Sequence, residues 1–249
     1  MSIQKLQFNN RTILTPSRDS FVAFTESVPP TPPVPSLPSD MDFVYLANDF
    51  DGSKIPNKAT GTNAFGPYLQ QGTITKNGNG SSCYLSNDHS TSNYLYIDLT
   101  SAQLNTMKPS SGAYSFFIRV QSTSSGLGAI FSWRLNNDSS YIYMIRANNG
   151  KLQLHSTTGY DSSFDLDESQ VYKVVVESST LTAYKLSTGS TFAISHGSYN
   201  MSTKMSTFNA YPYSGEGVLD RMYGLAGIAR ATTTEEDTQI KEYLMSQGV

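Results

Sequence analysis

Acidic side chains, a common source of acid–base and metal chemistry, gather at two places in this sequence. One run, Asp-Leu-Asp-Glu, spans 165–168, and the other, Asn-Asp-Phe-Asp, spans 48–51. Carboxylates serve as general acids and bases or, with amide oxygens, hold calcium. The second run lacks the spacing of a known calcium loop, and the first precedes a predicted strand rather than lying within one. We interpret both as turns and expect no cofactor, with a calcium site as the alternative.

Nucleophilic and metal-binding side chains are few and scattered. His89, His155 and His196 have no metal-like spacing to another histidine, cysteine or acid. Cys83 is the single cysteine, so a disulfide within the chain is excluded. We interpret it as a small strand residue, with a nucleophile or an intermolecular bridge as the alternative. No Gly-x-Ser-x-Gly elbow or phosphate-binding loop occurs. The sequence therefore predicts no catalytic residues and no metal site, and leaves open a Ser-His-Asp triad assembled by folding.

Aromatic residues offer another chemistry, the stacking of a sugar ring. In the loop 208–215, Tyr211 and Tyr213 flank a proline, and Asn209 supplies an amide for sugar hydroxyls. Tyr160 and Asp161 form a second polar–aromatic group in a predicted turn. We predict that these five residues bind a ligand. The alternative is that the tyrosines pad the edge of the fold or contact another subunit.

Period-two alternation predicts the elements that must position these residues. Apolar and polar side chains alternate over the ranges 114–121, 131–135, 141–145, 152–154, 172–177, 181–186 and 192–194. Such alternation, bounded by turns such as Asn148–Gly150, is typical of half-buried antiparallel strands. These strands must bury one face against a second sheet or close into a barrel. The pattern therefore predicts an all-β domain.

One helix is predicted, at the end of the chain. Thr232 and Glu235 have the spacing of a capping box, and the acidic run 235–237 suits the positive end of a helix. An apolar stripe follows within 240–244. We predict a short helix that closes the β domain.

The clearest domain boundary is a proline-rich segment at 28–39, which holds six of the chain's 11 prolines. Proline fixes φ and removes a hydrogen-bond donor, so an extended polyproline II spacer of about 37 Å is expected at about 3.1 Å per residue. An SH3-type ligand is the alternative. The segment separates residues 1–27 from a domain at 40–249.

The 27 N-terminal residues carry too few apolar side chains to fold alone. Lys5–Phe8 and Arg11–Leu14 read as two short strands around two asparagines, followed by an apolar patch within 21–24. We expect an attachment segment that is ordered against a partner protein or against copies of itself. A homo-oligomer, with a trimer favoured, is the expected assembly.

Composition and charge argue against two classes of partner. The net charge is −3 and no basic run occurs, so we expect no nucleic-acid partner. No stretch approaches the roughly 20 apolar residues of a membrane span, and the first residues lack the apolar core of an export signal. Charged residues make up only 15%, so Ser, Thr, Asn and Gly must supply the polar surface, as suits an extracellular or particle-bound protein.

Four segments carry a family resemblance. In chain order they are NDFDGSKIPNKA, NYLYIDL, YSFFIRVQ and YGLAGIARATTTEEDTQIKEYL. From about residue 41 to the end, the chain resembles the laminin-G-like, concanavalin A-like lectin and glucanase superfamily. The resemblance implies an antiparallel two-sheet jelly-roll sandwich, a short C-terminal helix and, before them, an extended N-terminal arm. Residues 48–51 then resemble the opening turn of that family.

The order of segments also resembles virion proteins of bacteriophages, which place an attachment segment and a linker before a lectin-like head. That resemblance implies a non-enzymatic head fibre, capsid decoration or tail fibre protein, assembled in the host cytoplasm and acting outside it. Residues 1–27 would bind other virion proteins, and the head would bind a host-surface or environmental glycan.

Two other functions stay open, a bacterial carbohydrate-binding module and a glycoside hydrolase of the same fold. Hydrolases of the superfamily carry Glu-x-Asp-x-Glu on one strand. The nearest match here, 165–168, has the wrong order.

Overall fold

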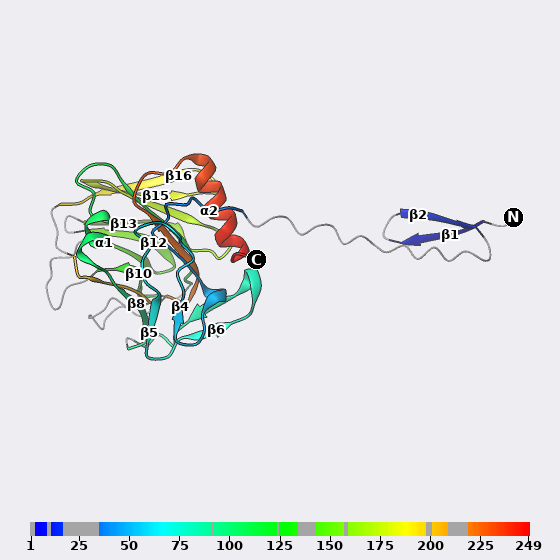
Figure 1. Cartoon of the computed structure of the whole chain (residues 1–249), viewed down its shortest axis with the longest axis horizontal. Helices are drawn as coiled ribbons and strands as arrows, with labels where there is room; N and C mark the ends of the chain where they lie inside the picture. Colours follow the sequence, from blue (N-terminus) through cyan, green and yellow to red (C-terminus); the bar gives the residue numbers. More distant parts are fainter. Residues whose placement is uncertain are drawn as a thin grey trace. The chain divides into compact units, whose positions relative to one another are not determined.

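The computed structural model describes residues 3–8, 11–16, 35–90, 92–123, 125–133, 143–156, 159–197, 201–208 and 219–249 (Figure 1). The chain divides into two compact units, Met1–Pro33 and Val34–Val249.

The smaller unit contains an antiparallel hairpin of β1 (Ile3–Phe8) and β2 (Arg11–Pro16). Leu6 lies opposite Ile13 in the register. Both predicted short strands are confirmed, and each is two residues longer than the sequence pattern indicated. A two-stranded hairpin by itself is marginally stable in water, so this unit depends on further contacts for its stability.

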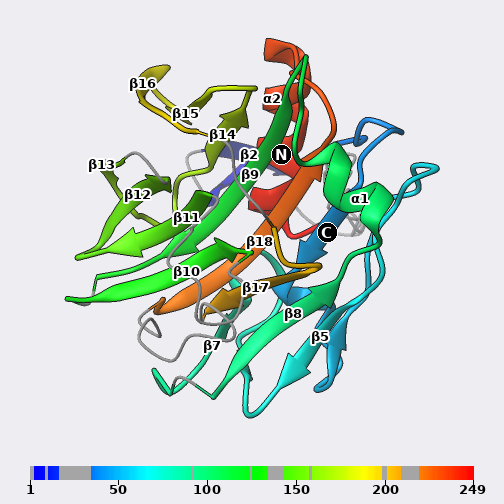
Figure 2. The ribbon, with the colours of Figure 1, turned by 90° about the vertical axis from the view of Figure 1, so that its left-hand side faces the viewer.

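The larger unit is a sandwich of two antiparallel sheets, which confirms the predicted all-β fold. Sheet I faces the viewer in Figure 2 and has the strand order β13 (Gly159–Asp165), β12 (Lys151–Ser156), β11 (Tyr143–Asn148), β10 (Leu127–Ser132), β17 (Lys204–Phe208), β8 (Tyr94–Asp98), β5 (Tyr68–Gln71) and β4 (Lys54–Ile55).

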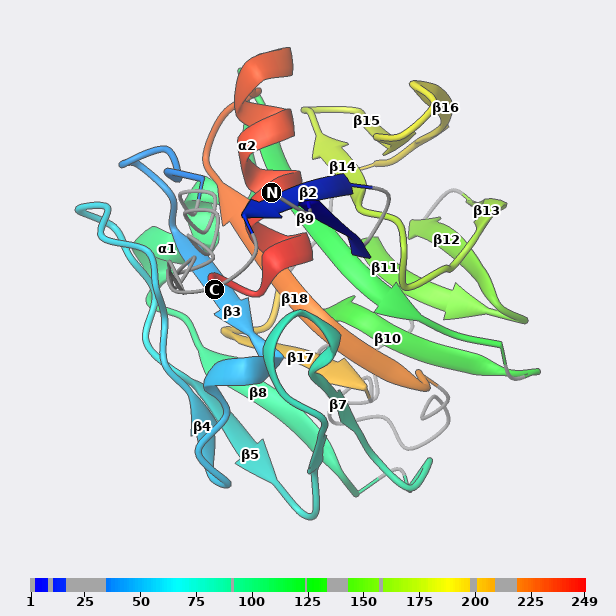
Figure 3. The ribbon, with the colours of Figure 1, turned by 90° about the vertical axis from the view of Figure 1, so that its right-hand side faces the viewer.

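Sheet II forms the other layer and faces the viewer in Figure 3. Its order is β16 (Ser190–Ser195), β15 (Thr180–Lys185), β14 (Tyr172–Val176), β9 (Tyr114–Gln121), β18 (Arg221–Ile228), β7 (Tyr84–Ser86) and β6 (Thr75–Asn77), and β3 (Phe43–Leu46) also pairs with β18.

The core fills the space between the sheets because the alternating apolar side chains of both face inward. At its centre the ring of Phe43 lies 5.8 Å from that of Phe131, and Phe116 lies 5.0 Å from Phe131. Aromatic pairs at these distances add about 0.5–1.5 kcal/mol to the free energy of unfolding beyond the area they bury. Asn149 and Gly150, both with positive φ, close the predicted tight turn between β11 and β12.

A second apolar cluster lies between sheet II and the C-terminal helix α2 (Thr234–Ser246), which crosses the outer face of that sheet in Figure 3. Ile240 and Leu244, one helical turn apart, are fully buried against Phe117 and Ala226. Each buried aliphatic side chain of this size contributes about 1.5–3 kcal/mol. Because α2 covers it, β9 is buried on both faces.

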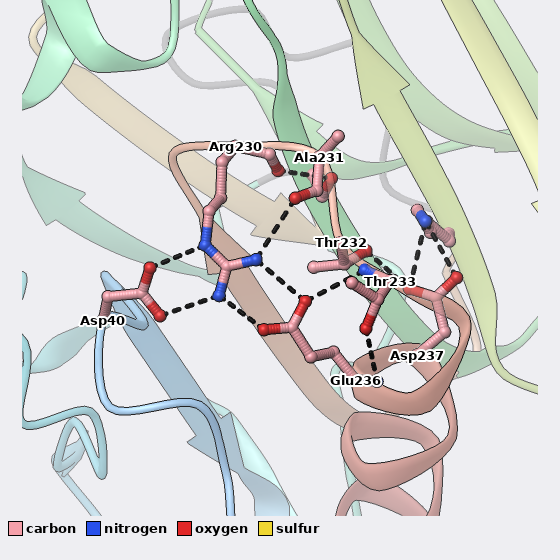
Figure 4. Close-up of polar contacts among 9 residues, drawn as sticks. Asp40, Arg230, Ala231, Thr232, Thr233, Glu236 and Asp237 are labelled. Carbon is pink, nitrogen blue, oxygen red and sulfur yellow. Dashed lines mark hydrogen bonds and ion pairs between the residues drawn. The ribbon is translucent and has the colours of Figure 1, made fainter.

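The helix begins one residue later than the sequence predicted. Thr233, not Thr232, is the N-cap, and its partner in the capping box is Glu236 rather than Glu235. The predicted register is therefore wrong by one residue, because Arg230 draws Glu236 to the helix start. Figure 4 shows the Arg230 guanidinium between Asp40, at 2.6 and 2.9 Å, and Glu236, at 2.7 and 2.8 Å. These bonds lower the pKa of Glu236 to about 2.

A short helix that the sequence analysis missed, α1 (Ser101–Thr106), follows β8. Thr100 and Gln103 form its capping box, which has the Thr-x-x-Gln spacing of the motif. Only Leu104 of its six residues is buried, so the helix has no apolar periodicity for a sequence pattern to detect.

Short 3-10 turns complete the sandwich at Ala47–Asp49 (η1) and Gly80–Ser82 (η2). Within the described part of the chain, no helix is long and apolar enough to cross a membrane.

Candidate ligand-binding site

Of the five residues predicted to bind a ligand, Asn209, Tyr211 and Tyr213 lie outside the described residues. Tyr160 and Asp161 lie on β13, an edge strand of sheet I, so the predicted turn at this place is wrong. Tyr160 pairs with His155 of β12 and is 70% exposed. The structure therefore places Tyr160 as an exposed aromatic on a strand edge.

The acidic runs are engaged in local contacts. The Asp51 carboxylate accepts hydrogen bonds from the Ser53 hydroxyl and from the backbone N–H groups of Lys54 and Ser53, which closes its own turn and lowers its pKa. Asp165 ends β13 and pairs with Lys151 at 2.9 Å. Within the described ranges, no three His, Cys, Asp or Glu side chains form a metal-binding group.

The histidines and the cysteine also have structural surroundings. His89 pairs with Asp220 at 3.1 Å, and the Nε2 atom of His196 lies 2.7 Å from the carbonyl oxygen of Glu177. Cys83 is buried directly after η2, not within a strand as predicted, and burial raises the pKa of its thiol.

The outer face of sheet II contains a hollow of about 540 Å³ beside the end of α2. Side chains from four places line it: Tyr84 on β7, Arg119 on β9, Arg221 and Tyr223 on β18, and Glu168 in the turn before β14. Ser81 and Ser82 of η2, together with Gly78, Ser169 and Met245, complete the wall. We call this the arginine–tyrosine hollow.

A β-bulge in β18 shapes the floor of the hollow. Met222 pairs with Val120 and Gly224 with Arg119, so Tyr223 is the extra residue without a partner on β9. Bulges of this kind redirect side chains and are frequent next to functional sites. The carbonyl oxygen of Tyr223, left outside the ladder, accepts a hydrogen bond of 2.8 Å from the Nε2 atom of Gln247.

The side chains in the hollow form a ladder of two aromatic rings between two cations. The Arg221 guanidinium lies 4.4 Å from the centre of the Tyr84 ring, and the Arg119 guanidinium lies 4.6 Å from that of Tyr223. The two tyrosine rings lie between them with their centres 5.6 Å apart. Each cation–π contact contributes about 0.5–2 kcal/mol, so the four side chains hold one another in place.

Arg119 anchors the ladder to its surroundings. Its Nη1 atom donates to the carbonyl oxygens of Ser81, Leu244 and Met245 at 3.0–3.2 Å, and its Nε donates to that of Glu168 at 3.0 Å. The side chain is 6% exposed, and burial lowers its pKa while leaving it charged at neutral pH. Arg119 thus ties η2, the end of α2 and the Glu168 turn to one strand.

Glu168 connects the two halves of the ladder. Its carboxylate accepts a hydrogen bond from the Tyr223 hydroxyl and pairs with Arg221 at 3.4 Å. Burial raises the pKa of Tyr223 to about 12, so the phenol stays protonated and continues to donate. The hydrogen bond with Tyr223 raises the pKa of Arg221, which remains a cation.

This arrangement suits binding better than acid–base catalysis. Hydrolysis of a glycosidic bond requires two carboxylates that face each other across the substrate. Among the residues that line the hollow, Glu168 supplies the single carboxylate, and Tyr223 and Arg221 already occupy it. A half-buried ring, two guanidinium groups and the serines of η2 instead offer stacking and hydrogen bonds to a polar ligand.

Sequence reasoning predicted none of these residues as a ligand-binding residue, and it interpreted Glu168, in the acidic run 165–168, as part of a turn. One available indication was Arg119, a charge inside the otherwise apolar strand YSFFIRVQ. The others come from loops, strands and the end of α2, up to 126 residues away from Arg119 in the chain, and no local pattern relates them.

Comparisons with known proteins give matches among solved structures only. No protein-family model matches the chain, and none of the curated proteins does. The receptor-binding domain of botulinum neurotoxin C/D mosaic serotype is 13% identical, with a TM-score of 0.54 over 81% of this chain and 50% of that one. The botulinum neurotoxin serotype C1 binding domain is 12% identical, with a TM-score of 0.56 over 82% of this chain and 52% of that one.

The binding domain of Paraclostridial Mosquitocidal Protein 1 is similar to the same degree, at 13% identity and a TM-score of 0.55 over 80% of this chain and 52% of that one. The chain spans about half the length of the structures it matches. At this identity the likeness shows the fold: an all-β sandwich of the kind found in these binding domains.

Proposed function

We propose that this chain is a non-enzymatic binding protein whose sandwich recognises a glycan receptor through the arginine–tyrosine hollow. The observation that carries the proposal is the ladder of Arg221, Tyr84, Tyr223 and Arg119, which is held on a β-bulge at the edge of an open hollow. Aromatic rings supply a stacking surface for a sugar, and fixed polar groups select its hydroxyls.

The structural neighbours support a binding role. Each of the three described above is named as a binding or receptor-binding domain rather than a catalytic one. The single carboxylate in the hollow supports the same conclusion. A carbohydrate-binding module or a phage adhesion protein agrees better with these features than a hydrolase does.

We further propose that the protein belongs to a bacteriophage particle, as a head fibre, capsid decoration or tail-associated subunit that acts outside the cell. The support is the order of parts: a hairpin that is too small to be stable alone, a proline-rich spacer and a lectin-like head. The hairpin would attach to other virion proteins or to copies of itself.

A glycan array probed with the wild-type protein and with Tyr84→Ala tests the binding role. Wild type should bind at least one glycan, and Tyr84→Ala should bind it about tenfold more weakly. Stacking of a nucleic-acid base on an aromatic side chain is worth about 1–3 kcal/mol, and we expect a value at the lower end of that range for a sugar ring. Circular dichroism checks that the variant is folded.

Tyr160→Ala is the matched control, since it removes an exposed tyrosine from the opposite sheet. If Tyr160→Ala abolishes binding and Tyr84→Ala does not, the site lies on sheet I. If wild type binds no glycan on the array, the proposed receptor class is wrong.

A further inference from the structure

We infer that the arginine–tyrosine hollow selects acidic sugars, whose carboxylate is attracted by the guanidinium groups of Arg119 and Arg221 that line it and whose ring lies beside Tyr84. This inference rests on the proposed glycan-binding function and goes beyond it by naming the chemical class of the ligand.

The first argument is the charge of the hollow. Its lining contains two guanidinium groups, on Arg119 and Arg221, and one carboxylate, on Glu168. Arg221 and Glu168 compensate each other at 3.4 Å. Arg119 forms no ion pair among the described residues, because its hydrogen bonds go to four backbone carbonyls. Glu168 acts on its charge through space, but that carboxylate is already paired with Arg221, so the hollow keeps a net positive charge. A ligand with one negative charge would balance it.

The second argument is the supply of donors. All the hydrogen bonds of Arg119 to described residues use Nε and Nη1, which leaves Nη2 for a ligand. The hydrogen bonds of Arg221 to described residues use Nη1 alone, toward Glu168 and the Tyr223 hydroxyl. Bonds from a guanidinium to a carboxylate are about twice as strong as those between neutral groups. Two such groups lining one hollow therefore favour an acidic ligand over its neutral counterpart.

The third argument is preorganisation. Arg119 is 6% exposed and is held by four carbonyls and a ring, so it loses little conformational freedom when a ligand binds. The hydroxyls of Ser81 and Ser82 and the half-buried Tyr84 ring line the same wall. A sugar that carries a carboxylate offers a partner to each of these groups: an anion, hydroxyls and an apolar ring face.

The test compares two pairs of sugars that differ in charge, by isothermal titration with the full-length protein. The pairs are trigalacturonate with galactotriose, and sialyllactose with lactose. Wild type should bind the acidic member of at least one pair about tenfold or more tightly than the neutral member. The preference should shrink as salt rises from low to high ionic strength.

Three variants test which residues cause the preference for the acidic sugar. Arg221→Gln should remove most of the preference, and Glu168→Gln should increase affinity for the acidic sugar, since it deletes a like charge while keeping an acceptor for Tyr223. Lys151→Gln removes one positive charge from sheet I, outside the hollow, and should leave the preference unchanged.

The results separate the two proposals. If wild type binds glycans on the array but prefers neither acidic sugar, the inference is wrong and the binding function stands. The inference is also wrong if Arg221→Gln and Lys151→Gln reduce the preference for the acidic sugar equally, because that preference would then reflect the net charge of the protein alone. If wild type binds no glycan at all, the proposed function itself fails.

Discussion

Arg119 illustrates how one buried charge can position several elements at once. Four backbone carbonyls from three segments accept its hydrogen bonds, and the Tyr223 ring covers its face. Removing the side chain would leave those carbonyls without a donor, at about 1–3 kcal/mol for each that water cannot reach. Arg119 is therefore part of the fold as well as of the hollow.

Asp42 is a buried acid in a less favourable environment. It is 3% exposed, its Oδ2 atom has no hydrogen-bond partner among the residues that the structure describes, and burial raises its pKa to about 6 despite an interaction with Tyr114. The folded protein therefore holds the Asp42 proton more strongly than the unfolded chain, in which the pKa is 3.8. It follows that the free energy of unfolding decreases as pH rises from about 4 through about 6.

We predict that Asp42→Asn stabilises the protein at pH 8, because the amide has nearly the same shape and carries no charge to desolvate. The gain in the free energy of unfolding should be about 1–3 kcal/mol and should vanish below about pH 3, where the aspartate is mostly protonated in both states. Urea denaturation at a series of pH values measures it.

Asp51→Asn is the control for this prediction, since that carboxylate is exposed and its pKa is lowered rather than raised. It should not stabilise the protein at pH 8. A loss of stability in Asp42→Asn at pH 8 would mean that the charged carboxylate is well accommodated, contrary to the argument above.

Helix α2 depends on contacts at both of its ends. At the start, Thr233 and Glu236 cap it and Arg230 links it to Asp40 (Figure 4). At the end, Gln247 adopts a left-handed conformation, and its side chain reaches the backbone of Cys83 and Tyr223. The helix therefore supports the bulge beneath the arginine–tyrosine hollow.

Thr233→Ala is expected to lower the free energy of unfolding by about 1 kcal/mol, because it removes the hydroxyl that caps the Glu236 N–H at 3.2 Å. Urea denaturation gives the change. Thr234→Ala, one residue into the helix, should be close to neutral. Equal effects of the two substitutions would show that the cap contributes nothing specific.

At the scale of the whole molecule, the β-sandwich unit begins before residue 40, where the sequence analysis placed its start. Leu37 packs against the cluster under α2, and Asp40 pairs with Arg230 at 2.6 Å. The last part of the proline-rich segment therefore contributes contacts to the sandwich, in agreement with the larger compact unit that begins at Val34.

Deletion of residues 1–27 should convert an oligomer, with a trimer expected, into a monomer whose head is as stable as before. The reason is that a two-stranded hairpin such as β1–β2 is marginal by itself, and we expect it to gain stability by pairing or packing with other copies. Sedimentation velocity of full-length and truncated protein measures the assembly. Monomers in both cases would rule out the self-association of this segment.

The sequence by itself determined the class of the fold. Period-two alternation predicted β9, β14, β15 and β16 because the periodicity of a strand is a local property of its own residues. The Asn149–Gly150 turn and the terminal helix were predictable for the same reason. Local patterns predicted the start of the terminal helix less accurately, because capping signals overlap at Thr232 and Thr233. They did not predict α1, because that helix has almost no buried face.

Only the tertiary structure decided where the candidate site lies. Tyr84, Arg119, Glu168 and Tyr223 are far apart in the chain and meet because β18 pairs with both β7 and β9. The bulge at Tyr223 depends on the register of that pairing, which no single strand encodes. Long-range strand pairing is a property of the whole sandwich, so residues that read as ordinary polar positions in the sequence come together in one hollow.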